Sequence, residues 1–261
     1  MTSFKTKSCL AVYHAFCEQK LSFQVIYGAR EVTSPKGLLV LDSSFNPPHS
    51  AHYNLVKRAI KHYNTQPLHV ILLLSVNNAD KAPKPATFEK RMEMMCIMAD
   101  ILEKENISAS VGITTYGKFV NKDKVLRRHF FKGGLVSYLV GFDTIIRVLN
   151  PKYYLPQSVP DALGEFMEST NFFCLTRKSD QELEKQIQYR SNISDGLYEP
   201  TIPRDWGQKI QIELNDDRYC AISSSHIREM VLKGSPAEAL EGQLPLPILK
   251  YVMEEGKQLF L

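Results

Sequence analysis

From Gly37 onward, short apolar runs alternate with stretches of helical periodicity, and this alternation limits the folds open to the chain. The runs at 38–41, 68–74, 135–140 and 172–175 are apolar almost throughout, as in strands buried on both faces. Helical segments at 51–63, 87–104, 122–131, 143–149 and 180–189 lie between or after them. Because strands connected through helices form parallel sheets, we predict an α/β fold with a doubly wound, mostly parallel sheet.

Both ends of the chain add elements to this pattern. Residues 4–20 predict a short amphipathic helix, 22–27 a strand and 28–36 a linker. Later segments predict strands at 108–115 and 209–214, a surface loop at 190–207, and helices near 224–233 and 245–255. We therefore predict an N-terminal extension over 1–36 and a main domain over 37–261, with a helical C-terminal region from about residue 223.

Composition and charge narrow the classes of function. The 261 residues are 44% hydrophobic and 23% charged, which is ordinary for a globular protein and excludes a wholly disordered chain. No apolar run approaches a membrane span and the N-terminus shows no secretory signal, so we expect a cytoplasmic location, with the nucleus as a second compartment. The net charge of +4 permits anionic ligands without indicating a nucleic-acid binder. The five cysteines are scattered, as is typical of free thiols.

The first buried strand runs into the segment 42–52, Asp-Ser-Ser-Phe-Asn-Pro-Pro-His-Ser-Ala-His. Its two prolines block a helix until about Ser50, so the helix begins there with free backbone N–H groups and the positive end of its dipole. His49 and His52 lie three positions apart and share one face if the first turn includes both. Charged histidines are disfavoured at this end unless an anion binds, and phosphate meets that requirement.

A second helix start, Ile-Ser-Ser-Ser-His-Ile-Arg at 222–228, follows the late strand. Ser223 or Ser224 can cap its first turn, and Gly234 would end the helix. Arg228 adds a guanidinium group that can bind phosphate through two hydrogen bonds. Alone, such a cap or a His-x-x-His pair is more often structural. Two anion-seeking starts at the carboxyl ends of one sheet instead indicate a shared polyphosphate site. We expect no metal site at the histidines, because no third ligand has a diagnostic spacing.

These segments resemble the motifs of nucleotidylyltransferases. Residues 43–52 resemble Gly-Ser/Thr-Phe-Asn/Asp-Pro-x-His-x-Gly-His, residues 222–228 resemble Ile-Ser-Ser-Thr-x-Ile-Arg, and residues 141–143 resemble Gly-Ala-Asp. The likeness is greatest to nicotinamide or nicotinic acid mononucleotide adenylyltransferases and runs from about Gly37 to the C-terminus. It implies a Rossmann-like fold and transfer of an adenylyl group from ATP to a pyridine mononucleotide, with Mg²⁺ carried by ATP.

The resemblance also implies a role for each matched residue. The catalytic residues would be His49, His52 and Arg228, with His52 the strongest candidate. ATP would contact Ser44, Phe45, His52, Gly141, Asp143, Ser223, Ser225, His226, Ile227 and Arg228. The mononucleotide would contact Ser43, Ser44, Lys81, Tyr116 and Tyr154. For Tyr154 and its neighbour Tyr153, stacking on the pyridine ring and ordinary core packing are both open.

Three further cationic segments have more than one possible role or a role at the surface. The family places a phosphate-binding lysine in the loop 77–85, where alignment leaves Ala82, so Lys81 or Lys84 would substitute. Arg91, in the first turns of the following helix, could also face phosphate. The basic stretch 118–132, which includes Lys122, is predicted to be a solvated helix face.

Two motif glycines are replaced here, by Ser43 and Ala51. Glycine permits close approach of a ligand to the backbone, so these changes affect substrate fit or rate. Two alternatives stay open beside the NAD-forming transferase: a nucleotide-binding regulatory protein with little turnover, and a related transferase with another phosphorylated acceptor. An aminoacyl-tRNA synthetase shares the histidine loop, but its Lys-Met-Ser-Lys-Ser segment is missing. The expected partners are ATP and a pyridine mononucleotide, with no nucleic acid and no membrane. The sequence leaves oligomerisation open.

Overall fold

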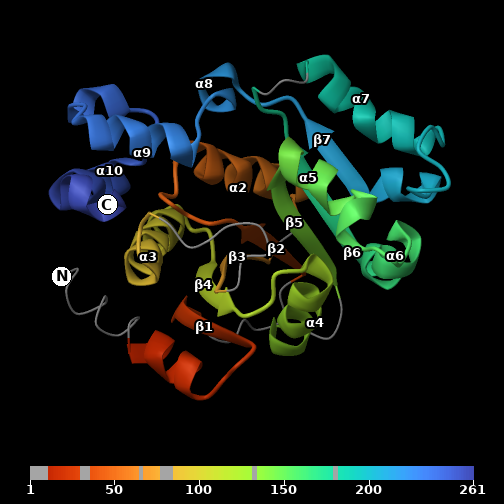
Figure 1. Cartoon of the computed structure of the whole chain (residues 1–261), viewed down its shortest axis with the longest axis horizontal. Coiled ribbons are helices and arrows are strands. Elements are labelled where there is room, and N and C mark those ends of the chain that lie inside the picture. Colours follow the sequence, from red (N-terminus) through yellow and green to blue (C-terminus); the bar gives the residue numbers. More distant parts are fainter. Residues whose placement is uncertain (1–10, 30–35, 65–66, 77–84, 131–133, 179–181) are drawn as a thin grey trace.

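A seven-stranded sheet forms the centre of the molecule (Figure 1). The computed structural model describes residues 11–29, 36–64, 67–76, 85–130, 134–178 and 182–261. The strands are β1 (Phe23–Gly28), β2 (Gly37–Asp42), β3 (Leu68–Ser75), β4 (Ala109–Thr114), β5 (Leu135–Gly141), β6 (Thr170–Leu175) and β7 (Ile210–Glu213). Their order is β1-β4-β3-β2-β5-β6-β7, and every neighbouring pair is parallel except β1 with β4. The predicted doubly wound α/β fold is confirmed.

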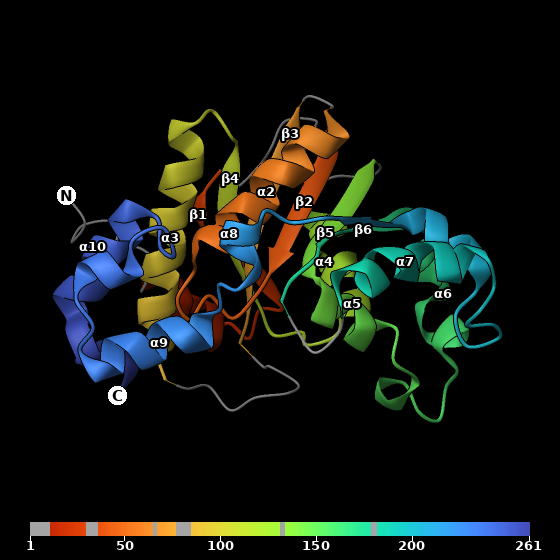
Figure 2. The same cartoon turned by 90° about the horizontal axis from the view of Figure 1, so that it is seen from above.

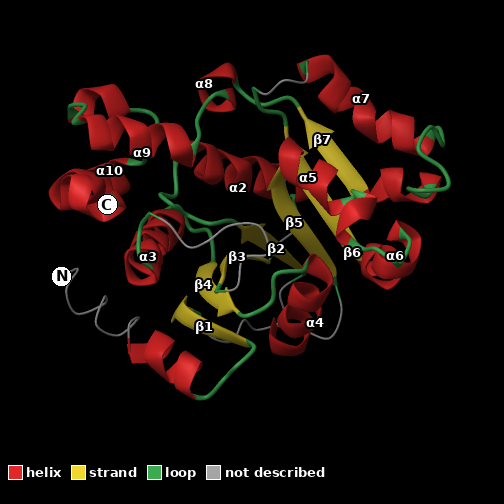
Figure 3. Ribbon diagram, in the orientation of Figure 1, coloured by secondary structure: helices red, strands yellow, loops and turns green. Residues whose placement is uncertain are grey.

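Helices cover both faces of the sheet (Figure 3). Leu39 and Leu41 share a core with α2 (Ser50–Tyr63), α3 (Phe88–Lys104), α9 (Ser224–Lys233) and α10 (Leu246–Glu255). Leu38 and Val40 point to the opposite face and pack with α4 (Phe119–Phe130), α5 (Phe142–Val148), α6 (Val159–Ser169) and α7 (Leu183–Ser194). Successive side chains of a strand point to opposite faces, and helices bury both faces. The central strands are therefore apolar at nearly every position.

The order of the strands creates a switch point between β2 and β5. From β2 the chain passes through α2 to β3 on one side, whereas β5 pairs with the other side of β2. The connections that leave β2 and β5 therefore diverge at the carboxyl ends of the strands, where doubly wound sheets bind ligands. In both Figure 1 and Figure 2, α9 and α10 lie beside α3 at one end of the molecule.

The N-terminal segment is built into the same sheet. Residues 11–18 are helical, and β1 adds an antiparallel strand along β4. Phe16 is 1% exposed within the core, and the Tyr27 hydroxyl donates a hydrogen bond to Asp100 of α3. The strand predicted at 22–27 is confirmed, while residues 4–10 of the predicted helix lie outside the described residues.

Two segments differ from the local predictions. Much of the predicted loop 190–207 is ordered, because α7 continues to Ser194 and a short 3-10 helix, η2 (Arg204–Lys209), packs on it with Trp206 buried. A Cβ on Gly207 would lie 2.1 Å from the Ser194 hydroxyl, so this close packing requires glycine.

Helix α6 was not predicted, although Ser158 caps it and a proline occupies its first turn. Among the described residues, no helix has the length and apolar character needed to cross a membrane.

Acid is expected to weaken this fold through His69 of β3. His69 is fully buried, its ring nitrogens lie 2.8 and 3.0 Å from the hydroxyls of Ser108 and Ser110, and burial lowers its pKa to about 4. Below the unfolded-state pKa of about 6.5, the unfolded chain takes up a proton that the folded chain refuses, so stability falls as the pH drops from about 6.5 to 4. Urea unfolding between pH 7 and pH 4.5 measures this slope. His69→Gln should reduce it by about 1 kcal/mol per pH unit, and an unchanged slope would contradict the assignment.

Candidate active site

The loop after β2 presents two stacked histidines. Helix α2 begins at Ser50, as predicted, with His49 as its N-cap. The backbone N–H of His52 donates to Nδ1 of His49 at 3.4 Å, and the backbone N–H of His49 donates to Nδ1 of His52 at 3.2 Å. The two rings stack with their centroids 3.7 Å apart. The histidines therefore form a reciprocal cap on the first turn, which fixes both rings against the helix.

This cap determines the protonation of both rings. Because each Nδ1 accepts a hydrogen bond, each neutral ring carries its proton on Nε2. Nε2 of His52 lies 3.1 Å from the Ser43 hydroxyl, to which it donates. Burial, with a smaller effect of the nearby Arg177 charge, lowers the pKa of His52 to about 3. Burial and the neighbouring His52 also hold the pKa of His49 well below its usual value. At neutral pH the pair supplies N–H donors without positive charge.

Helix α9 meets this loop from the other end of the chain. Ser223 caps α9 by accepting from the backbone N–H of His226, and Gly234 ends the helix in a left-handed conformation, both as predicted. The Ser224 hydroxyl donates to the carbonyl of Pro47, 177 positions earlier, at 2.9 Å. Arg228 donates to the carbonyl of Asn46 at 2.7 Å and to the Ser225 hydroxyl at 3.1 Å. The two helix starts singled out in the sequence thus lie against each other.

Both helix starts open into one cavity of about 680 Å³. Its lining includes Ser43, Ser44, His49, His52, Gly141, Asp143, Ser223, Ser225 and Arg228, which were all predicted site residues. A neighbouring cavity of about 330 Å³ shares Asp42, Ser43, Ser44 and Arg91 with the first. This smaller cavity is lined by the aromatic residues Phe119, Tyr153 and Tyr154. The polar loop after β2 therefore forms part of both cavities.

Two arginines give the larger cavity a surplus of positive charge. Arg91 is only 6% exposed, donates to the carbonyl of Ala86 at 3.0 Å and lines both cavities. Burial lowers the pKa of Arg91 and of Arg228, and the charge of Arg228 lowers that of Arg91 further. Within the described segments, no carboxylate forms an ion pair with either guanidinium group. Arg91 is buried and Arg228 is partly buried, and two such like charges are destabilising without an anion between them, so the site suits phosphate groups.

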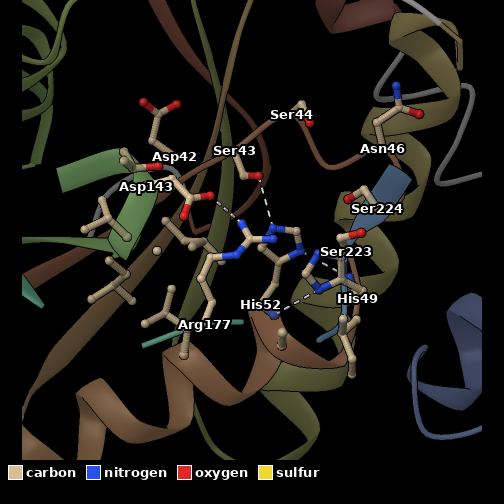
Figure 4. Close-up of a pocket in the computed structure, with 18 of the residues that line it drawn as sticks. Asp42, Ser43, Ser44, Asn46, His49, His52, Asp143, Arg177, Ser223 and Ser224 are labelled. Atoms are coloured by element: carbon tan, nitrogen blue, oxygen red, sulfur yellow. Dashed lines mark hydrogen bonds and ion pairs between the residues drawn. The ribbon is translucent and has the colours of Figure 1, made fainter. Parts of the chain in front are cut away.

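Arg177 lies two residues beyond the end of β6 and was not predicted as a site residue from the sequence. Its guanidinium group donates to Asp143 at 2.9 Å, and Figure 4 shows these side chains beside Ser43 and His52. The buried Gln186 accepts from the Arg177 backbone N–H at 3.1 Å and donates to its carbonyl at 2.8 Å, which fixes the start of this loop. Its position just beyond a buried strand could have predicted Arg177 as a site residue, because ligands of such sheets bind at the loops that follow the strands.

The prediction for Lys122 was wrong. Lys122 is 5% exposed rather than solvated, and its ammonium group pairs with Asp42 at the end of β2. The same group lies 5.1 Å from the centroid of the Phe119 ring, beside the smaller cavity. An aspartate at the end of a buried strand needs a cation, and α4 brings Lys122 to it.

Several predicted site residues lie elsewhere. Phe45 and Ile227 are fully buried and line neither cavity; Phe45, at φ +46°, packs its ring 5.4 Å from His52. The side chain of His226 is exposed and also outside both linings. Tyr116 lines neither cavity, although its carbonyl accepts from Ser75. Lys81 lies outside the described residues, as does Lys84. The described residues contain no group of three or more His, Cys, Asp or Glu suited to a metal ion.

Comparison with known proteins agrees with this geometry. Residues 40–230 match the cytidylyltransferase-like family. A Schizosaccharomyces pombe protein that carries the provisional name nicotinamide mononucleotide adenylyltransferase is 34% identical over 221 residues, which span 84% of this chain and 85% of that protein.

Solved structures show the same fold. A structure of Plasmodium falciparum nicotinic acid mononucleotide adenylyltransferase complexed with NaAD superimposes with a TM-score of 0.54 at 14% identity, covering 84% of this chain and 95% of the other. A second structure of that enzyme, complexed with APC, gives a TM-score of 0.50 with the same coverage. At this identity the likeness establishes the Rossmann-like nucleotidylyltransferase fold with its C-terminal helices.

Proposed function

Because this chain belongs to the cytidylyltransferase-like family of nucleotidylyltransferases, we propose that it transfers the adenylyl group of ATP to nicotinamide mononucleotide, giving NAD and pyrophosphate. Nicotinic acid mononucleotide would be a second acceptor. One observation carries the proposal: a large polar cavity, lined by the two neutral histidines and Arg228, adjoins a smaller aromatic cavity, and Arg91 lines both. ATP would fill the larger cavity, and the mononucleotide the smaller one.

The reaction asks little covalent chemistry of the protein. An oxygen of the mononucleotide 5′-phosphate forms a bond to the α-phosphorus of ATP in line, while the bond from that phosphorus to the bridging oxygen breaks and its electron pair leaves with pyrophosphate. The attacking phosphate is already ionised near neutral pH, so no general base is required. Mg²⁺ enters as part of the MgATP substrate and offsets triphosphate charge. The protein positions both phosphates and stabilises the transition state.

The side chains of the larger cavity divide this work. The Nε2–H group of His52 would donate to an oxygen on the α-phosphate, releasing Ser43, and His49 would donate beside it. Arg228 and Arg91 would offset the charge that develops on pyrophosphate. Asp143, held by Arg177, would accept hydrogen bonds from the ribose hydroxyls of adenosine. Ser223 and Ser225 line the cavity at the start of α9 and would donate to phosphate.

The smaller cavity suits a flat, weakly polar ring. The Tyr154 hydroxyl donates to the carbonyl of Val148 at 2.6 Å, which fixes the ring at the edge of the cavity. Phe119 and Tyr153 add aromatic surface. A pyridine ring can stack on such side chains through its face.

Loss of the Tyr154 ring is therefore expected to weaken mononucleotide binding. Tyr154→Ala should raise the KM for nicotinamide mononucleotide about tenfold, as expected from loss of one stacking contact. The KM for ATP should change much less, because Tyr154 lies outside the larger cavity. Tyr154→Phe keeps the ring and is the matched control, which steady-state kinetics should find close to the natural protein. Equal KM values for the alanine and phenylalanine variants would contradict the stacking role.

One assay separates the proposed reaction from its alternatives. Purified protein is incubated with MgATP and nicotinamide mononucleotide, and the dinucleotide and pyrophosphate are measured directly. A panel that includes nicotinic acid mononucleotide, phosphopantetheine and choline phosphate, each with ATP or CTP, tests other acceptors. ATP binding without product from any acceptor would support the regulatory alternative.

A further inference from the structure

A stack of three side chains connects the N-terminal segment to the shared region of the two cavities. The ring of Tyr13, in the helix at 11–18, stacks on Phe88 with the centroids 5.7 Å apart and the planes 7° from parallel. The guanidinium carbon of Arg91 lies 5.3 Å from the centroid of the same Phe88 ring. Phe88 itself lines the larger cavity, and Arg91 lines both. Tyr13 lines neither cavity and precedes the segment 40–230 that the family match covers.

The position of the Arg91 guanidinium depends on few contacts. Its Nε donates to the carbonyl of Ala86, and its charge lies over the Phe88 ring. No carboxylate of the described segments holds it in place, so the ring of Phe88 has a larger share in orienting it. A ring that is packed against a second ring keeps its rotamer better than one bounded by solvent. Tyr13 supplies that second ring.

The helix at 11–18 is itself anchored firmly enough to serve this purpose. Phe16 of this helix is buried in the core that α3 shares. Further along, β1 pairs with β4, and Tyr27 donates to Asp100 of α3. The N-terminal segment thus contacts α3 both at its first turn, through Tyr13, and in a later turn, through Tyr27.

We propose that the N-terminal segment is a working part of the phosphate site, in which Tyr13 is a positioning residue that sets Arg91 through Phe88. The ligand that the positioned Arg91 would bind is a nucleoside polyphosphate, at the place where the two cavities meet. The identity of that ligand as ATP rests on the proposed function, whereas the dependence of Arg91 on Tyr13 rests on the stack alone.

The test compares Tyr13→Ala with Tyr13→Phe, which keeps the ring and loses only the hydroxyl. Tyr13→Ala should weaken binding of MgATP, measured by titration calorimetry, about five- to tenfold and raise its KM to match, with a smaller change in kcat. Tyr13→Phe should bind within about twofold of the natural protein. A purely structural role would lower the melting temperature without changing the affinity of the folded protein, and normal MgATP affinity in folded Tyr13→Ala would overturn the proposal.

A double-mutant cycle with Arg91→Ala makes the test specific. If Tyr13 acts through Arg91, Tyr13→Ala should cause little further loss of MgATP affinity once Arg91 is alanine. Equal losses in both backgrounds would overturn the proposal. Should Tyr13→Ala fail to fold, Tyr13→Leu fills the space without a flat ring and replaces it in the cycle. Calorimetry needs no turnover, so a natural protein that binds MgATP and makes no dinucleotide would refute the transferase function and leave this cycle valid.

Discussion

Replacement of His52 with alanine is expected to lower kcat/KM for adenylyl transfer by about 10²–10³-fold, the usual effect of removing one preorganised donor. His52 is partly buried and neutral, and its Nε2–H group is aimed at the cavity by the hydrogen bond that its Nδ1 accepts from His49. Because the donor is fixed before substrate arrives, its loss should reduce the stabilisation of the transition state more than the binding of ATP. Steady-state kinetics with MgATP and nicotinamide mononucleotide measures both quantities.

The matched variant is His52→Gln, which keeps a neutral N–H donor on a side chain of similar reach. It should recover part of the lost rate, whereas alanine should not. Direct binding of MgATP should be affected less than kcat in both variants. If His52→Ala kept the kcat/KM of the unmodified protein, His52 would serve only to cap α2.

Arg228→Ala should lower kcat/KM by a similar factor, about 10²–10³-fold, because it removes both a charge near the leaving pyrophosphate and a brace of the loop after β2. The brace is the hydrogen bond from Arg228 to the carbonyl of Asn46. Arg228→Lys keeps the charge without the planar fork, so it should recover binding of MgATP better than it recovers kcat.

An exposed arginine provides the control. Arg218 lies outside both cavities, with 70% of its side chain exposed and an ion pair to Asp216. Arg218→Ala removes the same charge from the protein and should leave kcat and KM unchanged. If Arg228→Ala behaved like Arg218→Ala, Arg228 would have no part in the reaction.

The alternation of strands and helices and the two helix starts could be predicted because their causes are local. Prolines delay α2 until Ser50, Ser223 caps α9 and Gly234 ends it, and each of these effects acts within one turn of helix. The meeting of the two starts followed from the rule that ligands bind beyond the carboxyl ends of parallel strands.

Contacts between distant segments could not be predicted from such rules. Lys122 looks like part of a solvated basic face until α4 is packed beside Asp42, and the partner of Asp143 is a residue that follows another strand. The same is true of the N-terminal segment. A strand at 22–27 was readable from its residues, but its pairing with β4 and the stacking of Tyr13 on Phe88 are properties of the assembled fold.

The mutual capping of His49 and His52 has a consequence for the local electrostatics. Functional histidines are often oriented by a carboxylate, and a carboxylate beside these rings would repel the triphosphate. Here backbone N–H groups orient both rings, so their orientation requires no acidic side chain. The acids that do border the cavity, Asp42 and Asp143, are each neutralised by a basic neighbour. An incoming phosphate therefore meets oriented N–H donors without an unpaired negative charge beside them.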